Sequence, residues 1–200
     1  MSGREKEKLQ LILIAAFILV AGIGIAYAAL STTLTITMNK VTQNALTWNV
    51  AFTTGTVTGT AAGTSGTGRS CGNATVTANS VTVADTTLSK PGDKCTYALT
   101  IKNTGGIAAS LGSITGTAPT STTCNITNAS TSAGASMVCG NLTYKIGTDA
   151  SGTALKTGTT IAASTGTQAV YLIVEYTGTS LNSSAVTQSA GKFTFVYNQA

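Results

Sequence analysis

The sequence contains no histidine, the side chain that most often serves as a zinc ligand or a general base. Charged residues make up only 8% of the chain, far below the usual share of about a quarter. The acidic residues beyond the N-terminal region are scattered, with no motif to pair them: Asp85, Asp93, Asp149 and Glu175. No G-x-S-x-G motif frames a serine nucleophile. We therefore expect no enzymatic activity, no metal and no cofactor.

The net charge of +5 is spread thinly along the chain. The basic residues form no cluster and do not alternate with aromatic residues, so the sequence does not predict nucleic-acid binding. Mild attraction to anionic cell-wall polymers is the most that this charge supports. Proline is also scarce, with 2 residues against 22 glycines, and serine and threonine are abundant. Such a composition can mean a disordered stalk, but apolar residues reach 42% and recur at every second position, which favours a folded all-β domain.

The N-terminal region has the three parts of an export signal in order. A basic start leads into an apolar run over residues 9–29, and small residues follow at its end. The basic residues are Arg4, Lys6 and Lys8, and the small-x-small motif is Ala26-Tyr27-Ala28. We expect cleavage between Ala28 and Ala29 and an extracellular or cell-surface location. The run would extend ~31 Å as a helix, so a retained membrane anchor is the alternative.

The residues after the cleavage motif alternate strictly between two faces. One face carries Leu30, Thr32, Leu34, Ile36 and Met38, and the other face carries only serine and threonine. This pattern predicts a β-strand at the mature N-terminus, ready to pair with a sheet edge. The chain then divides into a signal peptide or anchor helix (1–28), an N-terminal, candidate donor strand (29–40) and a β-sandwich domain (41–200).

Strand signals recur throughout the remaining chain, without amphipathic helix signals. The expected strands cover residues 47–52, 75–83, 95–101, 108–114, 142–146, 169–176 and 192–198. On the first strand, Trp48, Val50 and Phe52 share a face, and on the third strand, Cys95, Tyr97, Leu99 and Ile101 face inward. The low-complexity residues 55–70 are expected to form a long loop or a frayed hairpin. Many short strands with turns between them predict an all-β fold with a two-sheet antiparallel sandwich.

Two local features refine this interpretation. Pro91-Gly92 suits a type II turn, which makes Asp93 a turn residue and not an acid catalyst. Glu175 interrupts an apolar strand, where a buried carboxyl group could promote a lysine–asparagine isopeptide bond. Alternation instead predicts that Glu175 lies on the solvent face, together with Tyr171 and Ile173.

The four cysteines of an exported chain predict two disulfides. Four thiols permit three connectivities. We favour Cys71–Cys95 and Cys124–Cys139, because each pair closes a local loop beside expected strands, and each could contribute on the order of 3 kcal/mol. A zinc site is the rival interpretation, but no pair has C-x-x-C spacing.

Several segments together resemble the TasA/camelysin-like family of exported proteins from Gram-positive bacteria. They are the leader–strand junction (24–36), residues 48–52, the unit 88–114 with Lys90-Pro91-Gly92-Asp93 and Asn103-x-Gly105, and the closing residues 191–195. The similarity covers about half of the chain, and the four cysteines depart from the family pattern. Camelysin-like proteins have been described as metallopeptidases, an activity that the absence of histidine argues against here.

The resemblance implies a jelly-roll-like sandwich that polymerises into extracellular fibres of a biofilm matrix. The implied mechanism is donor-strand exchange, in which the N-terminal strand of one subunit completes the sheet of the next. The implied partners are copies of the same chain, a signal peptidase during export, and a cell-wall or membrane anchor protein. Three alternatives stay open: residues 30–38 as the first strand of their own domain, a monomeric or membrane-anchored adhesin, and a type IV pilin-like subunit with a helical core.

Overall fold

The computed structural model describes residues 46–63, 68–119, 123–179 and 191–200. The chain divides into two units, Met1–Asn44 and Ala45–Ala200, and every described residue belongs to the second unit. The expected leader, the cleavage site at Ala28 and Ala29, and the expected strand at 29–40 lie outside these ranges. Among the described residues, no helix is long and apolar enough to cross a membrane.

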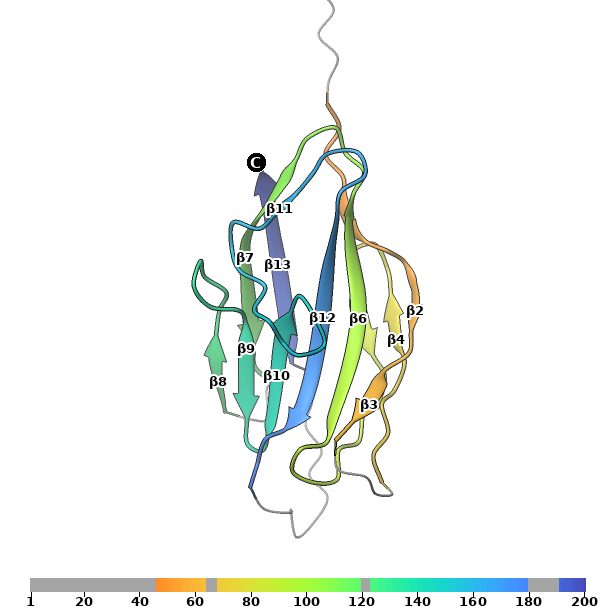
Figure 1. Ribbon diagram of the computed structural model, residues 1–200, viewed down its shortest axis with the longest axis vertical. Coiled ribbons are helices and arrows are strands. Elements are labelled where there is room, and N and C mark those ends of the chain that lie inside the picture. Colours follow the sequence, from red (N-terminus) through yellow and green to blue (C-terminus); the bar gives the residue numbers. More distant parts are fainter. Residues whose placement is uncertain (1–45, 64–67, 120–122, 180–190) are drawn as a thin grey trace, which may run out of the picture. The chain divides into compact units, whose positions relative to one another are not determined.

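The described ranges contain thirteen strands, all of them in antiparallel pairs (Figure 1). The strands are β1 (Val50–Phe52), β2 (Gly55–Val57), β3 (Thr60–Ala62), β4 (Ala74–Val76), β5 (Val81–Val83), β6 (Lys94–Asn103), β7 (Ala109–Thr117), β8 (Cys124–Thr127), β9 (Ser136–Cys139), β10 (Leu142–Gly147), β11 (Thr160–Ile161), β12 (Thr167–Tyr176) and β13 (Lys192–Gln199). The all-β class expected from the sequence is confirmed.

These strands form three sheets. The large sheet has the order β1-β6-β12-β10-β9-β8, with β3 also paired to β6. The β7 sheet has the order β11-β7-β13, and the β4 sheet has the order β2-β4-β5. The chain crosses between the large sheet and the β7 sheet at β6–β7, β7–β8, β10–β11, β11–β12 and β12–β13, so strands that pair are often distant in sequence.

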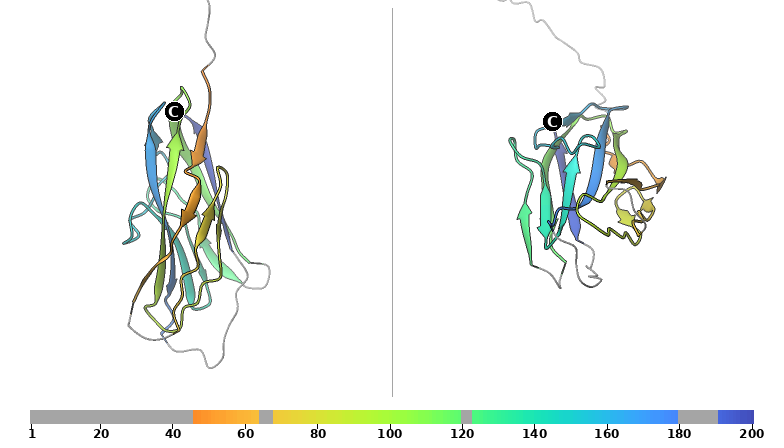
Figure 2. Two further views of the ribbon diagram at one scale, coloured as in Figure 1. Left: turned by 90° about the vertical axis from the view of Figure 1, so that its right-hand side faces the viewer. Right: turned by 60° about the horizontal axis from the view of Figure 1, so that its bottom comes forward.

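The large sheet and the β7 sheet share one hydrophobic core. Leu99 and Val170 enter this core from the large sheet, and Leu111 and Ile114 enter it from β7. The side view in Figure 2 shows the two sheets as separate layers. Burial alternates along β6 from Tyr97 to Asn103. The sequence predicts four residues of this strand to face inward, and all four are buried: Cys95, Tyr97, Leu99 and Ile101. Alternation with a period of two is therefore what places this strand.

The first expected strand, residues 47–52, begins later than the sequence predicts. Strand β1 begins only at Val50, and Trp48 is 41% exposed. The preceding residues pair with a turn instead of a strand, since the N–H of Gly106 donates to the carbonyl of Thr47. The carbonyl of Asn49 likewise accepts the N–H of Thr104, so these residues contact the turn after β6 and are not part of β1.

Two further expectations near the N-terminal side of the domain need correction. Residues 75–83 do not form one strand with a phase change, because β4 and β5 are separate strands that pair with each other. The turn between them is closed by Thr77, whose N–H donates to the carbonyl of Ser80 at 2.8 Å. Within the low-complexity stretch, β2 and β3 take the place of the expected loop or frayed hairpin. They do not pair with each other, because β2 pairs with β4 and β3 pairs with β6.

Two turns have the expected chemistry. The N–H of Asp93 donates to the carbonyl of Lys90 at 3.0 Å, and Gly92 has a φ of 86°, as a type II turn requires. At the other turn, the side chain of Asn103 is buried and its amide oxygen accepts the N–H of Gly105 at 3.0 Å. This second turn joins β6 to β7 and thereby sends the chain from the large sheet to the β7 sheet.

The outer face of β12 differs from the expectation in one residue. Glu175 is partly exposed and forms an ion pair with Lys145 at 3.1 Å, in agreement with a solvent-facing position. Ile173, expected on the same solvent face, is only 2% exposed. The loop after β10 covers it, with Gly152 lying against its side chain. A non-local loop thus buries a residue whose place in the alternation predicts exposure.

Candidate functional site

Among the residues that the structure describes, the last strand, β13, has a partner on one side only. β13 pairs with β7 along its whole length, from Lys192 opposite Thr117 to Gln199 opposite Ala109. No other strand of the described ranges pairs with β13. A free sheet edge of this kind presents unpaired backbone donors and acceptors and is a template for another strand.

The direction of the backbone groups along this edge follows from one hydrogen bond. The N–H of Ala200 donates to the carbonyl of Ala108, on the β7 side. Backbone groups of successive residues point to opposite sides of a strand, so those of Tyr197 and Gln199 point away from β7. The register with β7 shifts between Val196 and Tyr197. The groups of Phe193 and Phe195 nevertheless point away from β7 as well, because the residues opposite them, Gly116 and Ile114, bond on their far side to Asn128 and Ala129. The edge therefore offers four regularly spaced residues to an incoming strand.

The same residues carry an aromatic row that is only partly covered. Phe193, Phe195 and Tyr197 pack against the shared core but remain partly buried, in contrast to the fully buried Val170 of β12. The Phe195 ring meets that of Phe52 edge to face, with ring centroids 5.9 Å apart. An added strand beside β13 would cover the remaining apolar surface of this row, because its inward side chains would lie over the same core.

The hydroxyl group of Tyr197 is a second feature of this edge. Its oxygen is buried and has no hydrogen-bond partner among the residues that the structure describes. Burial raises the pKa of Tyr197 to about 12, because the charged phenolate would lose its hydration. A buried hydroxyl without a hydrogen-bond partner loses its hydration and gains nothing in return, so it lowers the stability of the described domain.

Other edge strands in the described ranges are shorter or locked. β8 has four residues, and the Cys124–Cys139 disulfide ties it to β9 at a position where the two cysteines lie directly opposite. β5 also has a partner on one side only, but it has three residues. β13 has eight residues and is the longest of these edges.

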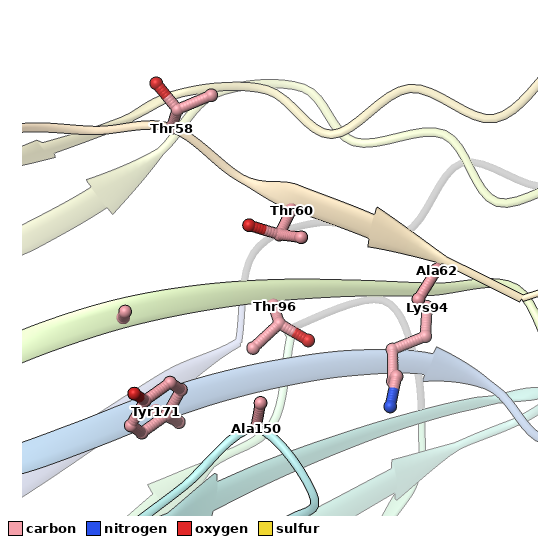
Figure 3. Close-up of a pocket in the computed structure, with 8 residues that line it drawn as sticks. Thr58, Thr60, Ala62, Lys94, Thr96, Ala150 and Tyr171 are labelled. Atoms are coloured by element: carbon pink, nitrogen blue, oxygen red, sulfur yellow. The ribbon is translucent and has the colours of Figure 1, made fainter.

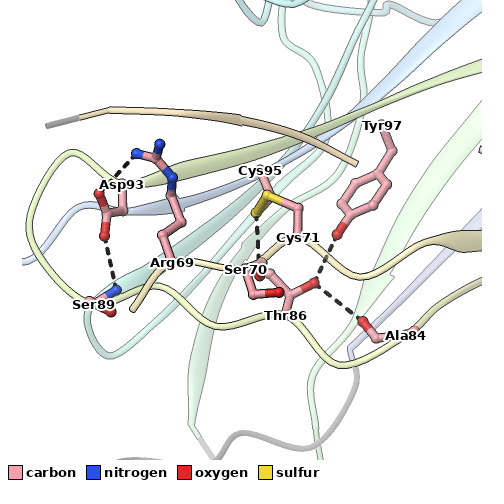
Figure 4. Close-up of a disulfide and its surroundings, with 9 residues drawn as sticks. All are labelled: Arg69, Ser70, Cys71, Ala84, Thr86, Ser89, Asp93, Cys95 and Tyr97. Atoms are coloured by element: carbon pink, nitrogen blue, oxygen red, sulfur yellow. Dashed lines mark hydrogen bonds and ion pairs between the residues drawn. A yellow bond between two sulfur atoms is a disulfide. The ribbon is translucent and has the colours of Figure 1, made fainter. Parts of the chain in front are cut away.

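A cluster of structural contacts joins the segments that flank the β4 sheet to β6 and the turn before it (Figure 4). The Cys71–Cys95 disulfide lies at its centre, beside the buried ring of Tyr97, whose hydroxyl pairs with that of Thr86 at 2.8 Å. The carboxylate of Asp93 is 1% exposed. It accepts the N–H groups of Ser89 and Lys90 and pairs with the guanidinium of Arg69 at 3.3 Å. These bonds use both carboxylate oxygens, so Asp93 is structural.

A shallow hollow lies on the outer face of the large sheet (Figure 3). Its volume is about 200 Å³, and β3, β6, β12 and the loop after β10 all contribute to its lining. Tyr171 and Lys94 lie at its two ends, with Thr96 and Ala150 between them. This hollow is separate from the β13 edge, since it faces away from the shared core.

The structure brings together some of the residues that the sequence singles out. The four cysteines form Cys71–Cys95 and Cys124–Cys139, which is the pairing favoured from the sequence. The donor-strand residues Leu30, Thr32, Leu34, Ile36 and Met38 and the cleavage residues Ala26, Ala28 and Ala29 lie outside the described ranges. Sequence reasoning identifies 192–198 as a strand but not as a site, although its aromatic alternation is the signal that marks it.

The described ranges contain no group of three or more histidine, cysteine, aspartate or glutamate side chains able to hold a metal ion. No protein-family model matches the sequence, and no curated protein and no solved structure is significantly similar to it. The interpretation of function therefore depends on the residues and the geometry of the chain itself.

Proposed function

We propose that this protein is a structural subunit of extracellular surface fibres or of a biofilm matrix, assembled by N-terminal donor-strand exchange. In this proposal, residues 29–40 of one copy add as a strand to the free edge of β13 in the next copy. Main-chain hydrogen bonds then join the two strands, and alternate side chains fill the space over the core. Such a head-to-tail contact does not close on itself, so it repeats along a fibre.

The half-covered aromatic row beside the free edge of β13 is the observation that carries the proposal. The candidate donor, residues 30–38, is nine residues long, and β13 has eight. Its apolar face, with Leu34, Ile36 and Met38, is suited to the surface that Phe193 and Phe195 leave exposed. Four buried apolar side chains would stabilise the contact by roughly 6–12 kcal/mol before the costs of ordering and association.

The wider interpretation belongs to the same proposal. The shared core of the large sheet and the β7 sheet supports a jelly-roll-like two-sheet sandwich, and with it membership of the TasA/camelysin-like family. Two disulfides are typical of an oxidising compartment and support export past a cleaved leader or a retained anchor helix over residues 1–28. The absence of histidine supports a non-catalytic role.

Polymerisation of the chain that begins at Ala29 tests the proposal. We expect the wild-type protein to form filaments in negative-stain microscopy and to elute as large species in size-exclusion chromatography. Ile36→Lys is expected to leave monomers, because a charge on the apolar face of the donor would be buried without a partner. Thr35→Lys is the matched control, since the same charge on the opposite face stays in solvent.

The two variants make the outcomes distinct. Filaments from wild type and Thr35→Lys but not from Ile36→Lys support donor-strand exchange. Persistent monomers of the wild-type chain at high concentration contradict it and favour a surface-binding domain. Filaments from all three proteins mean that another contact drives assembly, and this result also rejects the proposed mechanism.

A further inference from the structure

The hollow on the outer face of the large sheet combines three kinds of side chain. Tyr171 of β12 contributes an aromatic ring, Thr60 of β3 and Thr96 of β6 contribute hydroxyl groups, and Lys94 of β6 contributes an ammonium group. Tyr171 lies opposite Ala98, four residues along β6 from Lys94, so the two ends of the hollow are about 13 Å apart at the backbone. Figure 3 shows the two side chains at opposite ends.

The polar groups of this hollow have no partner among the residues that the structure describes. The hydroxyl groups of Thr60, Thr96 and Tyr171 take part in no hydrogen bond there, and Lys94 forms no ion pair. The nearest carboxylate in the strand register, Glu175 opposite Lys94, is paired with Lys145 instead. One positive charge is thus left over at the end of a concave surface that also offers an aromatic face and several hydroxyl groups.

We propose that this hollow binds a short stretch of an acidic polysaccharide. The apolar C–H face of one pyranose ring packs on the Tyr171 ring, and the carboxylate of a uronic acid unit pairs with the Lys94 ammonium. The threonine hydroxyl groups exchange hydrogen bonds with sugar hydroxyl groups between these two ends. Mostly apolar concave surfaces with a few placed polar groups are typical of small-ligand sites.

The geometry favours a sugar acid over other anions. A phosphate or another compact anion would need only Lys94 and would leave the aromatic ring and the neighbouring Ala150 uncovered. A neutral sugar would cover the ring but leave Lys94 without a counter-charge. A uronate oligosaccharide satisfies both ends at once, and its length suits their separation. This inference does not depend on fibre formation, because every residue of the hollow belongs to one chain.

Titration of the full chain with defined oligosaccharides tests the site. The probes are trigalacturonate and the neutral trisaccharide maltotriose, with binding followed by calorimetry or by ligand-observed NMR. We expect weak binding of trigalacturonate, on the order of 0.1–1 mM, and at least tenfold weaker binding of maltotriose. Ile36→Lys serves as a polymerisation-blocked background, so a result for the hollow is obtained whether or not the chain forms fibres.

Four variants separate the site from general charge attraction. Lys94→Gln and Tyr171→Ala are each expected to weaken trigalacturonate binding about fivefold, whereas Tyr171→Phe keeps the ring and binds within about twofold of the parent. Lys156→Gln removes the same charge from an exposed loop and is expected to bind within about twofold. Absence of trigalacturonate binding to the parent overturns the proposal. So does an equal loss in Lys94→Gln and Lys156→Gln, or unchanged binding in Tyr171→Ala.

Discussion

Truncation of Phe195 to alanine has a consequence that differs between the monomer and the polymer. A fully buried phenylalanine costs about 3–5 kcal/mol when it is replaced by alanine. Phe195 is partly buried in the described domain, where its ring meets Phe52. We therefore expect the monomer to lose about 2 kcal/mol of unfolding free energy. The donor strand would cover the rest of the ring, so the polymer contact should weaken by roughly another 2 kcal/mol, or about thirtyfold in critical concentration.

Two assays separate these contributions. Urea unfolding in the Ile36→Lys background measures the stability of the monomer, and sedimentation of filaments from the chain that begins at Ala29 measures the critical concentration. Val196→Ala is the control, because Val196 lies on the outer face of the same strand and is 45% exposed. It should change the unfolding free energy of the monomer and the free energy of the polymer contact by no more than about 0.5 kcal/mol each. A Phe195→Ala protein with a lower stability but an unchanged critical concentration would refute the assignment of this row to the donor contact.

Three further predictions concern the stability of the domain. Replacing Cys71 and Cys95 together by alanine should lower the unfolding free energy in urea by about 3.5 kcal/mol, from the loop entropy of a bridge with a sequence separation of 24; a loss below about 1 kcal/mol contradicts this. Asp93→Asn should lower the free energy of thermal unfolding by about 2–3 kcal/mol, because the buried carboxylate accepts two backbone N–H groups and pairs with Arg69. Tyr197→Phe should raise the unfolding free energy by about 1 kcal/mol, since it removes a buried hydroxyl that has no hydrogen-bond partner among the described residues. Burial disfavours the phenolate and raises the pKa of Tyr197 from 10.0 to about 12, so ionisation leaves the unfolding free energy unchanged below pH 10 and lowers it as the pH rises from 10 through about 12. The unfolding free energy of Tyr197→Phe should accordingly fall less steeply with pH between 10 and 12 than that of the wild type. An equal slope in the two proteins would contradict the burial of this hydroxyl.

The strands that the sequence predicts well are those with long alternating or apolar runs. β6, β10 and β13 each contain an alternating run and β12 contains a continuous apolar run, and their observed ends lie within about two residues of the expected ones. The disulfide pairing could also be predicted, because each bridge closes a local loop beside strands, with sequence separations of 24 and 15. In these cases the local pattern and the tertiary structure agree, which is the condition under which such reasoning succeeds.

Local pattern is insufficient where a distant segment decides the outcome. Ile173 alternates with buried residues and yet is buried itself, because the loop after β10 folds over it. The three-residue strands β2 to β5 carry too few residues for a period to be visible, and only their partners define them. Short strands at edges depend on pairing more than on intrinsic preference.

The candidate sites depend on topology in the same way. The alternation of Phe193, Phe195 and Tyr197 predicts a strand, but their partial exposure follows from the lack of a second neighbour for β13 in the described ranges. The outer hollow unites residues from β3, β6 and β12, which are far apart in sequence. Threonine and alanine are so common in this chain that nothing in the sequence marks those positions.

Amide hydrogen exchange along β13 tests the central claim most directly, because neighbouring amides of this strand point to opposite sides. The amides of Tyr197 and Gln199 point toward the free edge, whereas the Ala200 amide donates to β7. On comparing filaments of the chain that begins at Ala29 with Ile36→Lys monomers, we expect exchange at Tyr197 and Gln199 to slow at least a hundredfold in the filaments, as for amides in stable strand pairs. Exchange at these two amides that is equally fast in filament and monomer would show that no strand adds to β13.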